Sequence, residues 1–484
     1  IYTLEEVSKH KTKATGVWVY YKDGVYDITK FIPNHPGGQD KIMLAAGSDI
    51  GPFWNLYQQH YNSALPIEIL NSLRIGTLSL KDIEYLKESQ SKQDLNDPYK
   101  KDPILSPVLN YLSRKPLNAE PPITLLTDSY LTPINLWFVR NHHPVVQINN
   151  ENHSFNINID ENTNIKERME VNMKLTDMKN KFKSYDVIAT LQCGGNRRLE
   201  MTKLEKTNGS SWSNAISTAK WTGARLRDVL LGTGLNSNIQ HVIFHGADNM
   251  QASIPLKKAL SRDGDVLLAY AMNDQPIPPQ HGAPLRAIVP GHVGVRNVKW
   301  VQRITLSAEE ATGPWQRGMS YKVCIDVEAI PSLQEQPVQS AITHPTPTIG
   351  EERVSISSEE PLTVKGYAYS GGGRGIIRVD VSIDNGKTWS NATITEGTCL
   401  STTDTTIEYK QSIDKAWGWC FWECDFPINK EDIGKKVTIL SKATDASYNV
   451  QPDTVEGIWN LRGINNNAWS RIQAEIVDMD KEED

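Results

Sequence analysis

The sequence predicts a multidomain α+β protein with a small α+β domain, a mixed α+β domain and an immunoglobulin-like β-sandwich at its carboxyl end. Three observations support this prediction. The chain has 484 residues, which suits about three domains. Hydrophobic residues make up 39% of it and charged residues 22%, as in proteins that bury sizeable cores. Beyond residue 104, short apolar or alternating stretches outnumber helix-like ones, and they are most regular beyond residue 346.

The composition argues against three broad classes of protein. A net charge of −6 is not that of a general nucleic-acid binder. No apolar run approaches the length that spans a membrane. Five cysteines are too few, and odd in number, for a disulfide framework. We therefore expect no nucleic-acid partner, no membrane span and no disulfide scaffold.

Residues 1–80 have the pattern of a small α+β domain. Thr3, with Glu6 three residues later, is typical of a helix start. Residues 16–20 and 24–28 read as two strands joined by a tight turn.

Two histidines of this domain have a metal-binding pattern. His35 is followed by Pro36, Gly37 and Gly38, so the loop is stiff and leaves space beside the imidazole. His60 follows an aromatic segment. A lone histidine is more often surface or hydrogen-bonded core, but two neutral imidazoles across an apolar slot can ligate haem iron from both sides. With both axial positions filled, such an iron favours electron transfer over oxygen chemistry.

This stretch closely resembles the cytochrome b5 family over essentially all of residues 1–80. The resemblance implies one haem b per subunit, with His35 and His60 as the axial ligands of its iron. Electron transfer is then the expected task of the domain.

Residues 81–103 are rich in Lys, Glu, Asp, Gln and Ser and have few large apolar residues. This composition predicts a solvated, flexible linker. A tether of this kind would let the haem domain swing between two docking partners, while a passive spacer fits the composition equally well.

A cysteine at the end of a strand is the central feature of residues 104–345. Residues 185–192 read as a buried strand of apolar and β-branched residues. The strand ends at Cys193, and the two glycines that follow let the backbone turn sharply and let a bulky group come close. Arg197 and Arg198 favour the thiolate, the form that binds soft metals, and can also bind an oxyanion. A buried structural cysteine near a glycine turn is the alternative for this stretch alone.

Polar and basic residues recur at the ends of other expected strands. Residues 136–139 and 242–244 each read as an apolar strand followed by polar groups. The Asn-rich residues 149–164 read as a surface hairpin or loop. Each polar cluster alone is more often a solvated loop, but together with the cysteine they suit a polyanionic cofactor or substrate.

Several of these stretches resemble the molybdenum-cofactor domain of the sulfite oxidase family, from about residue 104 to the carboxyl end. The matching segments are residues 138–142, 193–198, 215–221, 297–300 and 315–322, together with Arg286. The resemblance implies that Cys193 supplies the one protein thiolate to molybdenum, beside the two sulfurs of a pterin dithiolene. The residues implied to hold the pterin and its phosphate are Phe138, Val139, Arg140, Asn141, His142, Asp248, His281, Arg286, Asn297, Val298 and Lys299. The residues implied to surround the substrate are Arg140, Arg198, Trp212 and Tyr321.

Residues 346–484 have the pattern of a β-sandwich. Residues 361–369, 377–389 and 437–445 read as strands, and the second contains an Asn-Gly turn. Several strands with regular turns indicate an immunoglobulin-like fold without a bridging cysteine pair. A structural or dimer-forming role is the plain interpretation, and the family resemblance implies a homodimer through this part.

Arg462, in residues 459–463, matches the place where the sulfite oxidase family contributes a further pocket arginine. Assimilatory nitrate reductases generally carry methionine there. Three guanidinium groups, those of Arg140, Arg198 and Arg462, suit a doubly charged sulfur oxyanion better than singly charged nitrate. A salt-bridged surface arginine would be the interpretation if the flanking match were absent.

The leading hypothesis is therefore an enzyme that oxidises sulfite to sulfate, with one molybdenum-molybdopterin group and one haem b per subunit. Electrons would leave one at a time through the haem to an external carrier, expected to be cytochrome c. The resemblance also implies the mitochondrial intermembrane space. One alternative is a nitrate-reducing relative, although plant-type nitrate reductases place the haem domain after the molybdenum domain and append a flavin domain. The other is a haem electron carrier fused to a non-catalytic scaffold.

Overall fold

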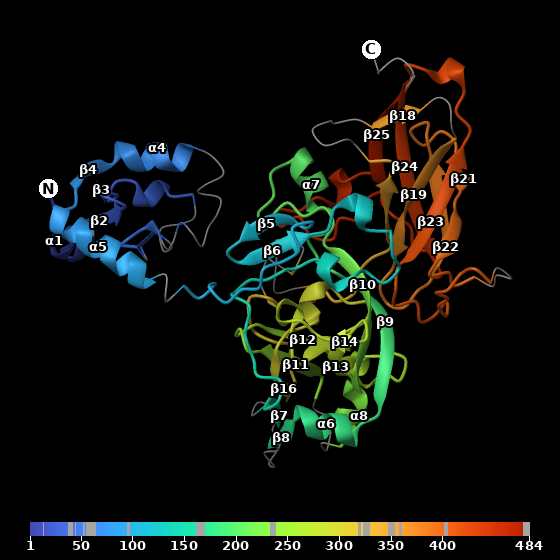
Figure 1. The fold of residues 1–484 in the computed structure, drawn as a ribbon, viewed down its shortest axis with the longest axis horizontal. Coiled ribbons are helices and arrows are strands. Elements are labelled where there is room, and N and C mark those ends of the chain that lie inside the picture. Colours follow the sequence, from blue (N-terminus) through green and yellow to red (C-terminus); the bar gives the residue numbers. More distant parts are fainter. Residues whose placement is uncertain are drawn as a thin grey trace. The chain divides into compact units, whose positions relative to one another are not determined.

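The computed structural model describes residues 1–12, 14–36, 42–43, 45–51, 54, 64–93, 97–160, 170–232, 239–317, 321–322, 330–346, 354–357, 361–400 and 405–477. The chain divides into two compact units, Ile1–Lys101 and Asp102–Asp484. The first unit is drawn in blue in Figure 1, and the second contains both the central domain and the β-sandwich.

The first unit is a four-stranded antiparallel sheet with helices, in agreement with the small α+β domain predicted for residues 1–80. Its strands pair in the order β1-β2-β3-β4. Thr3 caps the first helix, because its side chain accepts a hydrogen bond from the Glu6 N–H at 3.1 Å. Val19 and Ile28 belong to its apolar core. The bounds are α1 Leu4–Lys9, β1 Lys11–Thr12, β2 Gly16–Tyr21, β3 Gly24–Asp27, a 3₁₀ turn Ile32–Asn34, α4 Leu65–Ser72, β4 Arg74–Thr77 and α5 Leu80–Gln93.

Helix α5 occupies much of residues 81–103, where the sequence predicted a flexible linker, so the first half of that segment is folded. Ser79 caps the helix, since its Oγ accepts a hydrogen bond from the Asp82 N–H at 3.1 Å. Ile83 packs against the apolar cluster around Val7 of the first unit. The linker prediction was wrong for this half because Lys, Glu and Gln are as common on the exposed face of a helix as in a solvated linker.

The central part is built on two five-stranded sheets and a hairpin, β5-β6. One sheet has the order β14-β13-β10-β9 with β15 beside β13, and the other has the order β12-β11-β16-β7-β8. In these sheets β16 and β7 pair in parallel, whereas the other pairs are antiparallel. Helices α6 and α8 lie near the lower end of β9 in Figure 1. The strands are β5 Asn110–Arg114, β6 Leu117–Glu120, β7 Ser154–Ile159, β8 Glu170–Lys174, β9 Ser184–Gln192, β10 Ile216–Arg225, β11 His241–Gly246, β12 Gln251–Pro255, β13 Leu267–Met272, β14 Gln275–Pro276, β15 Arg286–Ile288 and β16 Val301–Ser307. The helices are α6 Leu175–Lys181, α7 Arg198–Leu204, α8 Leu226–Leu231 and α9 Leu256–Leu260, with 3₁₀ turns at Ile123–Leu125, Ile134–Leu136, Pro279–His281 and Gly294–Arg296.

Two local predictions for the central part differ from the structure. Residues 136–139 are not a strand, because a 3₁₀ turn ends at Leu136 and Val139 makes a single β-bridge, to Ala119. The Asn-rich stretch was expected to be a surface hairpin or loop, and β7 does pair with β8 in antiparallel fashion, but β7 also pairs with β16 and places Phe155 in the core, so the stretch is not confined to the surface. Its asparagines alternate with buried apolar residues, and this strand pattern was hidden by the overall composition.

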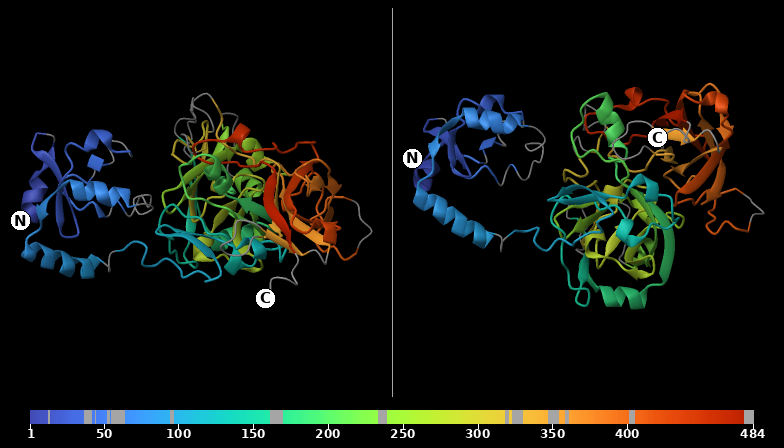
Figure 2. Two further views of the ribbon diagram at one scale, coloured as in Figure 1. Left: turned by 90° about the horizontal axis from the view of Figure 1, so that it is seen from above. Right: turned by 45° about the horizontal axis from the view of Figure 1, so that its top comes forward.

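The C-terminal part is a β-sandwich, as the sequence predicted. One sheet has the order β17-β19-β23-β22 and the other has the order β18-β25-β24-β20-β21. Both sheets contribute to one apolar core, which includes Val364 and Val379, and their strands, orange to red, stay together in both views of Figure 2. Strand β17 precedes residue 346 and pairs with β19, so the sandwich begins earlier in the chain than the predicted boundary. The bounds are β17 Gln339–His344, β18 Val354–Ser357, β19 Leu362–Tyr369, β20 Ile376–Ser382, β21 Ser390–Asn391, β22 Thr393–Glu396, β23 Cys420–Phe426, β24 Lys436–Asp445 and β25 Ser470–Val477, with 3₁₀ turns at Lys430–Asp432 and Glu456–Ile458.

Trp419 joins the sandwich to the central part. It is fully buried, and its indole N–H donates to the Tyr130 carbonyl at 3.0 Å, while the Tyr130 hydroxyl donates to the Trp419 carbonyl at 2.8 Å. The Trp419 backbone N–H donates to Thr190 Oγ1 on β9 at 2.8 Å. Because β9 leads directly into Cys193, this joint also fixes the strand that carries the cysteine.

Within the described residues, every helix is too short or too polar to cross a membrane.

We predict that Trp419→Ala lowers the free energy of unfolding of the second unit by about 3–5 kcal/mol, because it empties a buried site and removes an interdomain hydrogen bond. Urea denaturation followed by circular dichroism measures the change. Trp389→Ala is the control, since Trp389 is only partly buried and should cost less. An unchanged unfolding midpoint for Trp419→Ala would contradict the role of Trp419 in holding the sandwich against the central part.

Candidate functional site

A cavity in the central part has the Cys193 side chain in its wall. The wall comes from segments that are far apart in the sequence and that the two central sheets bring together. The lining residues are Trp137, Phe138, Arg140, His142, Cys193, Gly194, Asp248, Met250, Gln280, His281, Arg286, Gly294, Val295, Asn297, Val298, Lys299 and Tyr321.

Cys193 follows the last residue of β9, as predicted, and begins a tight turn. Its backbone N–H donates to the Ala215 carbonyl at 2.9 Å, and its carbonyl accepts from the Asn196 N–H at 2.9 Å. The Gly195 N–H points at Cys193 Sγ from 3.4 Å. The thiol therefore projects from a rigid turn into the cavity, with a backbone donor that stabilises a thiolate.

Arg197 anchors this turn to the C-terminal part. Its side chain is almost fully buried and donates to the carbonyls of Ser340 at 3.1 Å and Ala468 at 2.8 Å. The Gly194 carbonyl also accepts a hydrogen bond from the Asn465 N–H at 2.7 Å. The sandwich domain thus helps to set the position of the cysteine.

Positive charge gathers on one side of Cys193. Arg198 is 9% exposed and donates to the carbonyls of Gly463 at 3.0 Å and Ser210 at 2.8 Å. Burial lowers the pKa of Arg198, and the positive charges of Arg140 and Arg462 lower it further, against the opposing effects of Cys193 and Tyr321. Arg140 and Arg462 are thus each close enough to Arg198 to repel it, and a bound anion beside Arg198 would relieve that repulsion.

Two aromatic side chains complete this positive region. The Arg140 guanidinium lies 5.9 Å from the centre of the Trp212 ring. Trp212 is fully buried, and its indole N–H makes no hydrogen bond within the described residues. Burial raises the pKa of Tyr321, so its phenol is protonated at neutral pH and can donate a hydrogen bond.

Two further buried cations, Arg286 and Lys299, line the cavity. Arg286 is 7% exposed and donates to the carbonyls of His281 at 2.9 Å and Asn297 at 3.2 Å. Burial lowers the pKa of Arg286 to about 9 and that of Lys299 well below its usual value. The Lys299 ammonium donates to the carbonyls of Arg140 and Gln280 and to Asn141 Oδ1. In the part of the chain that the structure describes, neither Arg286 nor Lys299 forms a salt bridge.

These residues fit a phosphorylated heterocyclic cofactor. Burial lowers the pKa of His281 well below its usual value, so the imidazole is neutral, and its Nε2 has no hydrogen-bond partner within the described residues. An unpaired buried ring nitrogen suits a ligand with its own donors and acceptors, and a phosphate would offset the desolvation of Arg286 and Lys299. Cys193, on the wall of the same cavity, offers one soft ligand to a metal carried by such a cofactor.

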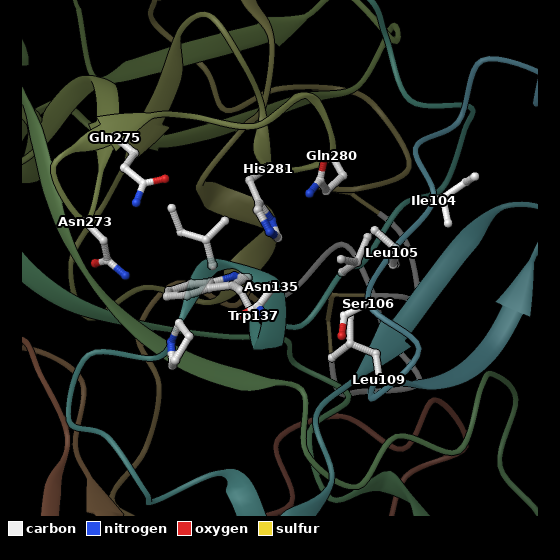
Figure 3. Close-up of a pocket in the computed structure, with 13 residues that line it drawn as sticks. Ile104, Leu105, Ser106, Leu109, Asn135, Trp137, Asn273, Gln275, Gln280 and His281 are labelled. Atoms are coloured by element: carbon white, nitrogen blue, oxygen red, sulfur yellow. The ribbon is translucent and has the colours of Figure 1, made fainter.

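A second cavity of about 530 Å³ adjoins the first, and the two share Trp137, Gln280 and His281. Figure 3 shows His281 beside Gln280 and Trp137, with Ser106 and Leu109 from the start of the central part facing them. His281 and Trp137 therefore form a thin partition between the cofactor cavity and this second space.

The structure brings most of the predicted site residues to one cavity but not all of them. Val139 lines the second cavity, and Asn141 acts through its hydrogen bond with Lys299. Arg198, Trp212 and Arg462 are not among the residues that line this cavity, but Trp212 lies beside the lining residue Arg140, and Arg198 interacts electrostatically with Cys193 and Arg140, which both line it. Sequence reasoning missed Trp137, Met250, Gln280, Gly294 and Val295, although each lies within two residues of a predicted site residue or of another cavity-lining residue.

In the first unit, His35 follows the 3₁₀ turn Ile32–Asn34 and is half-buried, with its ring edge-on to Phe31 at 6.0 Å between centroids. A histidine held against an aromatic ring at the end of a short turn fits an axial haem ligand. His60 lies outside the described residues, so the pairing of the two histidines stays a prediction.

Three family models match the chain. They are the Cytochrome b5-like Heme/Steroid binding domain over residues 3–79, the Oxidoreductase molybdopterin binding domain over residues 142–315 and the Mo-co oxidoreductase dimerisation domain over residues 331–477. Fold and cavity together thus define a molybdopterin-binding oxidoreductase with a haem domain. Its cofactors are molybdenum-molybdopterin and haem b.

Comparison with individual proteins shows which family of molybdopterin-binding oxidoreductases the chain belongs to. The chain is 43% identical to the mitochondrial sulfite oxidase of Rattus norvegicus, over 99% of this chain and 84% of the relative. It is 41% identical to the sulfite oxidase of Gallus gallus, over 97% of this chain and 99% of the relative. It is 33% identical to Nitrate reductase [NADH] 2 of Phaseolus vulgaris, over 91% of this chain and 50% of the relative. The chain belongs to the sulfite oxidase family.

The fold is shared more widely. The crystal structure of the sulfane dehydrogenase SoxCD from Paracoccus pantotrophus matches 76% of this chain and 85% of its own, with a TM-score of 0.59 at 23% sequence identity. At this identity the match shows the fold of the second unit and not its substrate.

We predict that Cys193→Ser keeps the fold and the haem but abolishes oxidation of the substrate, because serine offers no soft thiolate to the metal. Circular dichroism, the haem absorption spectrum and turnover measure the three properties. Cys424→Ser is the control, since Cys424 packs in the core of the sandwich and is not among the residues that line the cavity. Retained activity in Cys193→Ser would refute the role of Cys193 as a ligand.

Proposed function

We propose that this chain is a mitochondrial, molybdenum-dependent enzyme that oxidises sulfite to sulfate and works as a homodimer. The observation that carries the proposal is the cluster of Arg140, Arg198 and Arg462 beside Cys193. Sulfite at neutral pH is a mixture of its singly and doubly charged forms, and three cations in a partly dehydrated site favour the small dianion. Family membership and identity to sulfite oxidases over nearly the whole chain support the same activity.

The substrate-side residues hold the anion and exclude water. Arg140, Arg198 and Arg462 neutralise its charge, and the protonated hydroxyl of Tyr321 donates a hydrogen bond to an oxygen of it. Trp212, fully buried against Arg140, closes the wall and offers its free indole N–H.

The cofactor-side residues hold and orient the molybdenum group. Cys193 would be its protein ligand, Arg286 and Lys299 would pair with the phosphate, and the unpaired His281 imidazole would contact the pterin ring. When bound, molybdenum-molybdopterin supplies the two-electron oxidation of sulfur with oxygen from water, and haem b supplies one-electron transfer. The chain itself contributes position, charge and a water-poor cavity.

The external acceptor and the compartment are proposed on chemical and family grounds. A haem bound by His35 and His60 takes one electron at a time, which suits a one-electron carrier such as cytochrome c. The relatives named as mitochondrial support the same organelle, and a cytochrome c acceptor favours its intermembrane space.

The two alternatives have weaker support. The nitrate reductase relative is less similar, and the chain covers only half of its length. Nitrate carries a single charge and makes poorer use of three arginines. A haem carrier on a non-catalytic scaffold does not explain the buried cations and unpaired imidazole of the cavity.

We predict that Arg462→Met raises the KM for sulfite by about tenfold or more, because it removes one charged hydrogen-bond donor from a dianion. Arg471→Met, at an exposed position of β25, is the matched control and should leave KM close to the wild-type value. Steady-state kinetics at fixed ionic strength measures both. An unchanged KM in Arg462→Met would remove Arg462 from the substrate site.

The function itself is tested by assaying the molybdenum-loaded protein with sulfite and with nitrate as alternative substrates. We expect turnover with sulfite and cytochrome c, and none with nitrate and a reduced donor. Metal analysis should give molybdenum and iron in equal amounts. Nitrate turnover without sulfite turnover, or iron without bound molybdenum in protein from a molybdenum-sufficient host, would overturn the proposal.

A further inference from the structure

Arg296 is a fully buried charged side chain that the proposed chemistry does not use. It is fully buried at the end of the 3₁₀ turn Gly294–Arg296, and the first two residues of that turn line the cofactor cavity. Its backbone N–H donates to the Val293 carbonyl at 2.9 Å and closes the turn. Asn297, which follows, lines the cavity as well.

The Arg296 side chain does not line the cavity, and its guanidinium binds the chain on either side of Tyr321. Nε and Nη2 both donate to the Leu333 carbonyl, at 3.0 and 2.7 Å. Nη1 donates to the Trp315 carbonyl at 3.2 Å and also to Gln316 Oε1. These acceptors lie before and after Tyr321 in the sequence, so one fork holds both ends of the loop that carries it.

Tyr321 also contacts the Arg296 guanidinium and one of its partners, Leu333. The Arg296 guanidinium lies 5.7 Å from the centre of the Tyr321 ring. The Tyr321 carbonyl accepts a hydrogen bond from the Leu333 N–H at 2.8 Å. Leu333 therefore receives Arg296 on its carbonyl and binds Tyr321 through its amide.

A buried polar network makes this arrangement rigid. Gln316 Oε1 also accepts from the Ser253 N–H at 3.0 Å, and its Nε2 donates to Glu310 Oε2 at 2.9 Å. The Ser332 hydroxyl donates to Glu310 Oε2 at 2.7 Å. The network links β12 to both ends of the Tyr321 loop, with Arg296 at its centre.

Burying an arginine side chain at position 296 costs free energy, because the guanidinium loses its contact with water. Burial lowers the pKa of Arg296 to about 10, so it remains protonated, yet within the described residues it forms no salt bridge with a carboxylate. A buried cation held mostly by carbonyl oxygens is expensive unless its geometry serves a purpose. Lysine cannot supply donors in two directions from one rigid plane.

We propose that Arg296 is a positioning residue that fixes the Tyr321 hydroxyl relative to the cofactor wall. It does so by linking the turn that lines the cofactor cavity to both ends of the Tyr321 loop. The inference rests on the proposed role of Tyr321 in the substrate site. Arg296 touches neither substrate nor cofactor, and its effect on sulfite passes through Tyr321.

The test is a double-mutant cycle in the full-length holoenzyme. Arg296→Lys keeps the charge and loses the fork, and Tyr321→Phe removes the hydroxyl. Sulfite-dependent haem reduction, followed by stopped flow, gives kcat and KM separately. We expect Arg296→Lys to lower kcat/KM by about ten- to a hundredfold, since small misplacements near the reacting atoms have effects of this size. The double variant should be no worse than Tyr321→Phe alone, because the two residues act through one interaction.

Two controls separate positioning from folding and from charge. Arg317→Lys alters an arginine of the same loop whose guanidinium binds the carboxylates of Glu309 and Glu310, and it should leave kcat/KM close to wild type. Arg296→Met removes charge and fork together and should match Arg296→Lys. Should Arg296→Lys accumulate unfolded, Gln316→Met removes one acceptor of the fork and should show a smaller loss with the same non-additivity.

The outcomes distinguish this inference from the proposed function. If Tyr321→Phe leaves the kinetics unchanged, the role of Tyr321 fails. If Tyr321→Phe is impaired and Arg296→Lys is not, or their losses multiply in the double variant, the positioning role of Arg296 fails while that of Tyr321 stands. A loss in Arg296→Met but not in Arg296→Lys would assign the effect to charge and also overturn positioning.

Discussion

Buried positive charge around one thiol is the constraint on which the second unit depends. Removing guanidinium groups from water is expensive, and here the cost is offset largely by backbone carbonyls. Arg198 bonds to Gly463 and Ser210, and Arg286 bonds to His281 and Asn297. Carbonyl partners leave the positive charge uncancelled, so the cavity keeps a net attraction for anions.

The C-terminal part also helps to build this positively charged site, in addition to its role in dimerisation. The carbonyls that hold Arg197 belong to Ser340 and Ala468, and Asn465 binds the Cys193 turn through Gly194. Arg462 comes from the same part of the chain. The two domains of the second unit therefore share one site, which accords with their forming a single compact unit. We expect unfolding of the sandwich to release the cysteine turn even where the central sheets persist.

Much of the fold and site could be predicted because the signals are local. The Thr3 cap, the strand that leads into Cys193 and the strand predicted for residues 242–244 follow from short-range patterns, and the structure has the cap, β9 and β11 there, although β11 extends to His241–Gly246. The family resemblance is confirmed by the matches over all three domains. The roles of the individual site residues stay predictions, and so do the domain bounds.

The features that sequence reasoning missed depend on contacts between distant segments. Helix α5 packs on the first unit through a few apolar residues within a polar stretch, so composition gave no sign of it. No local pattern in the sequence marks Arg296, because its partners Trp315, Gln316 and Leu333 are set by tertiary structure. Gln280 likewise lines the cavity because it lies in the 3₁₀ turn Pro279–His281 beside His281.

The most direct test of the whole account is the haem spectrum of the holoprotein after anaerobic addition of sulfite. The account predicts that sulfite alone shifts the haem bands to the reduced form, with two electrons delivered for each sulfite consumed, while sulfate leaves the bands unchanged. The contrary result is an unchanged spectrum in protein that contains molybdenum and whose haem is still reduced by dithionite. In that case the arginine-lined cavity does not oxidise sulfite.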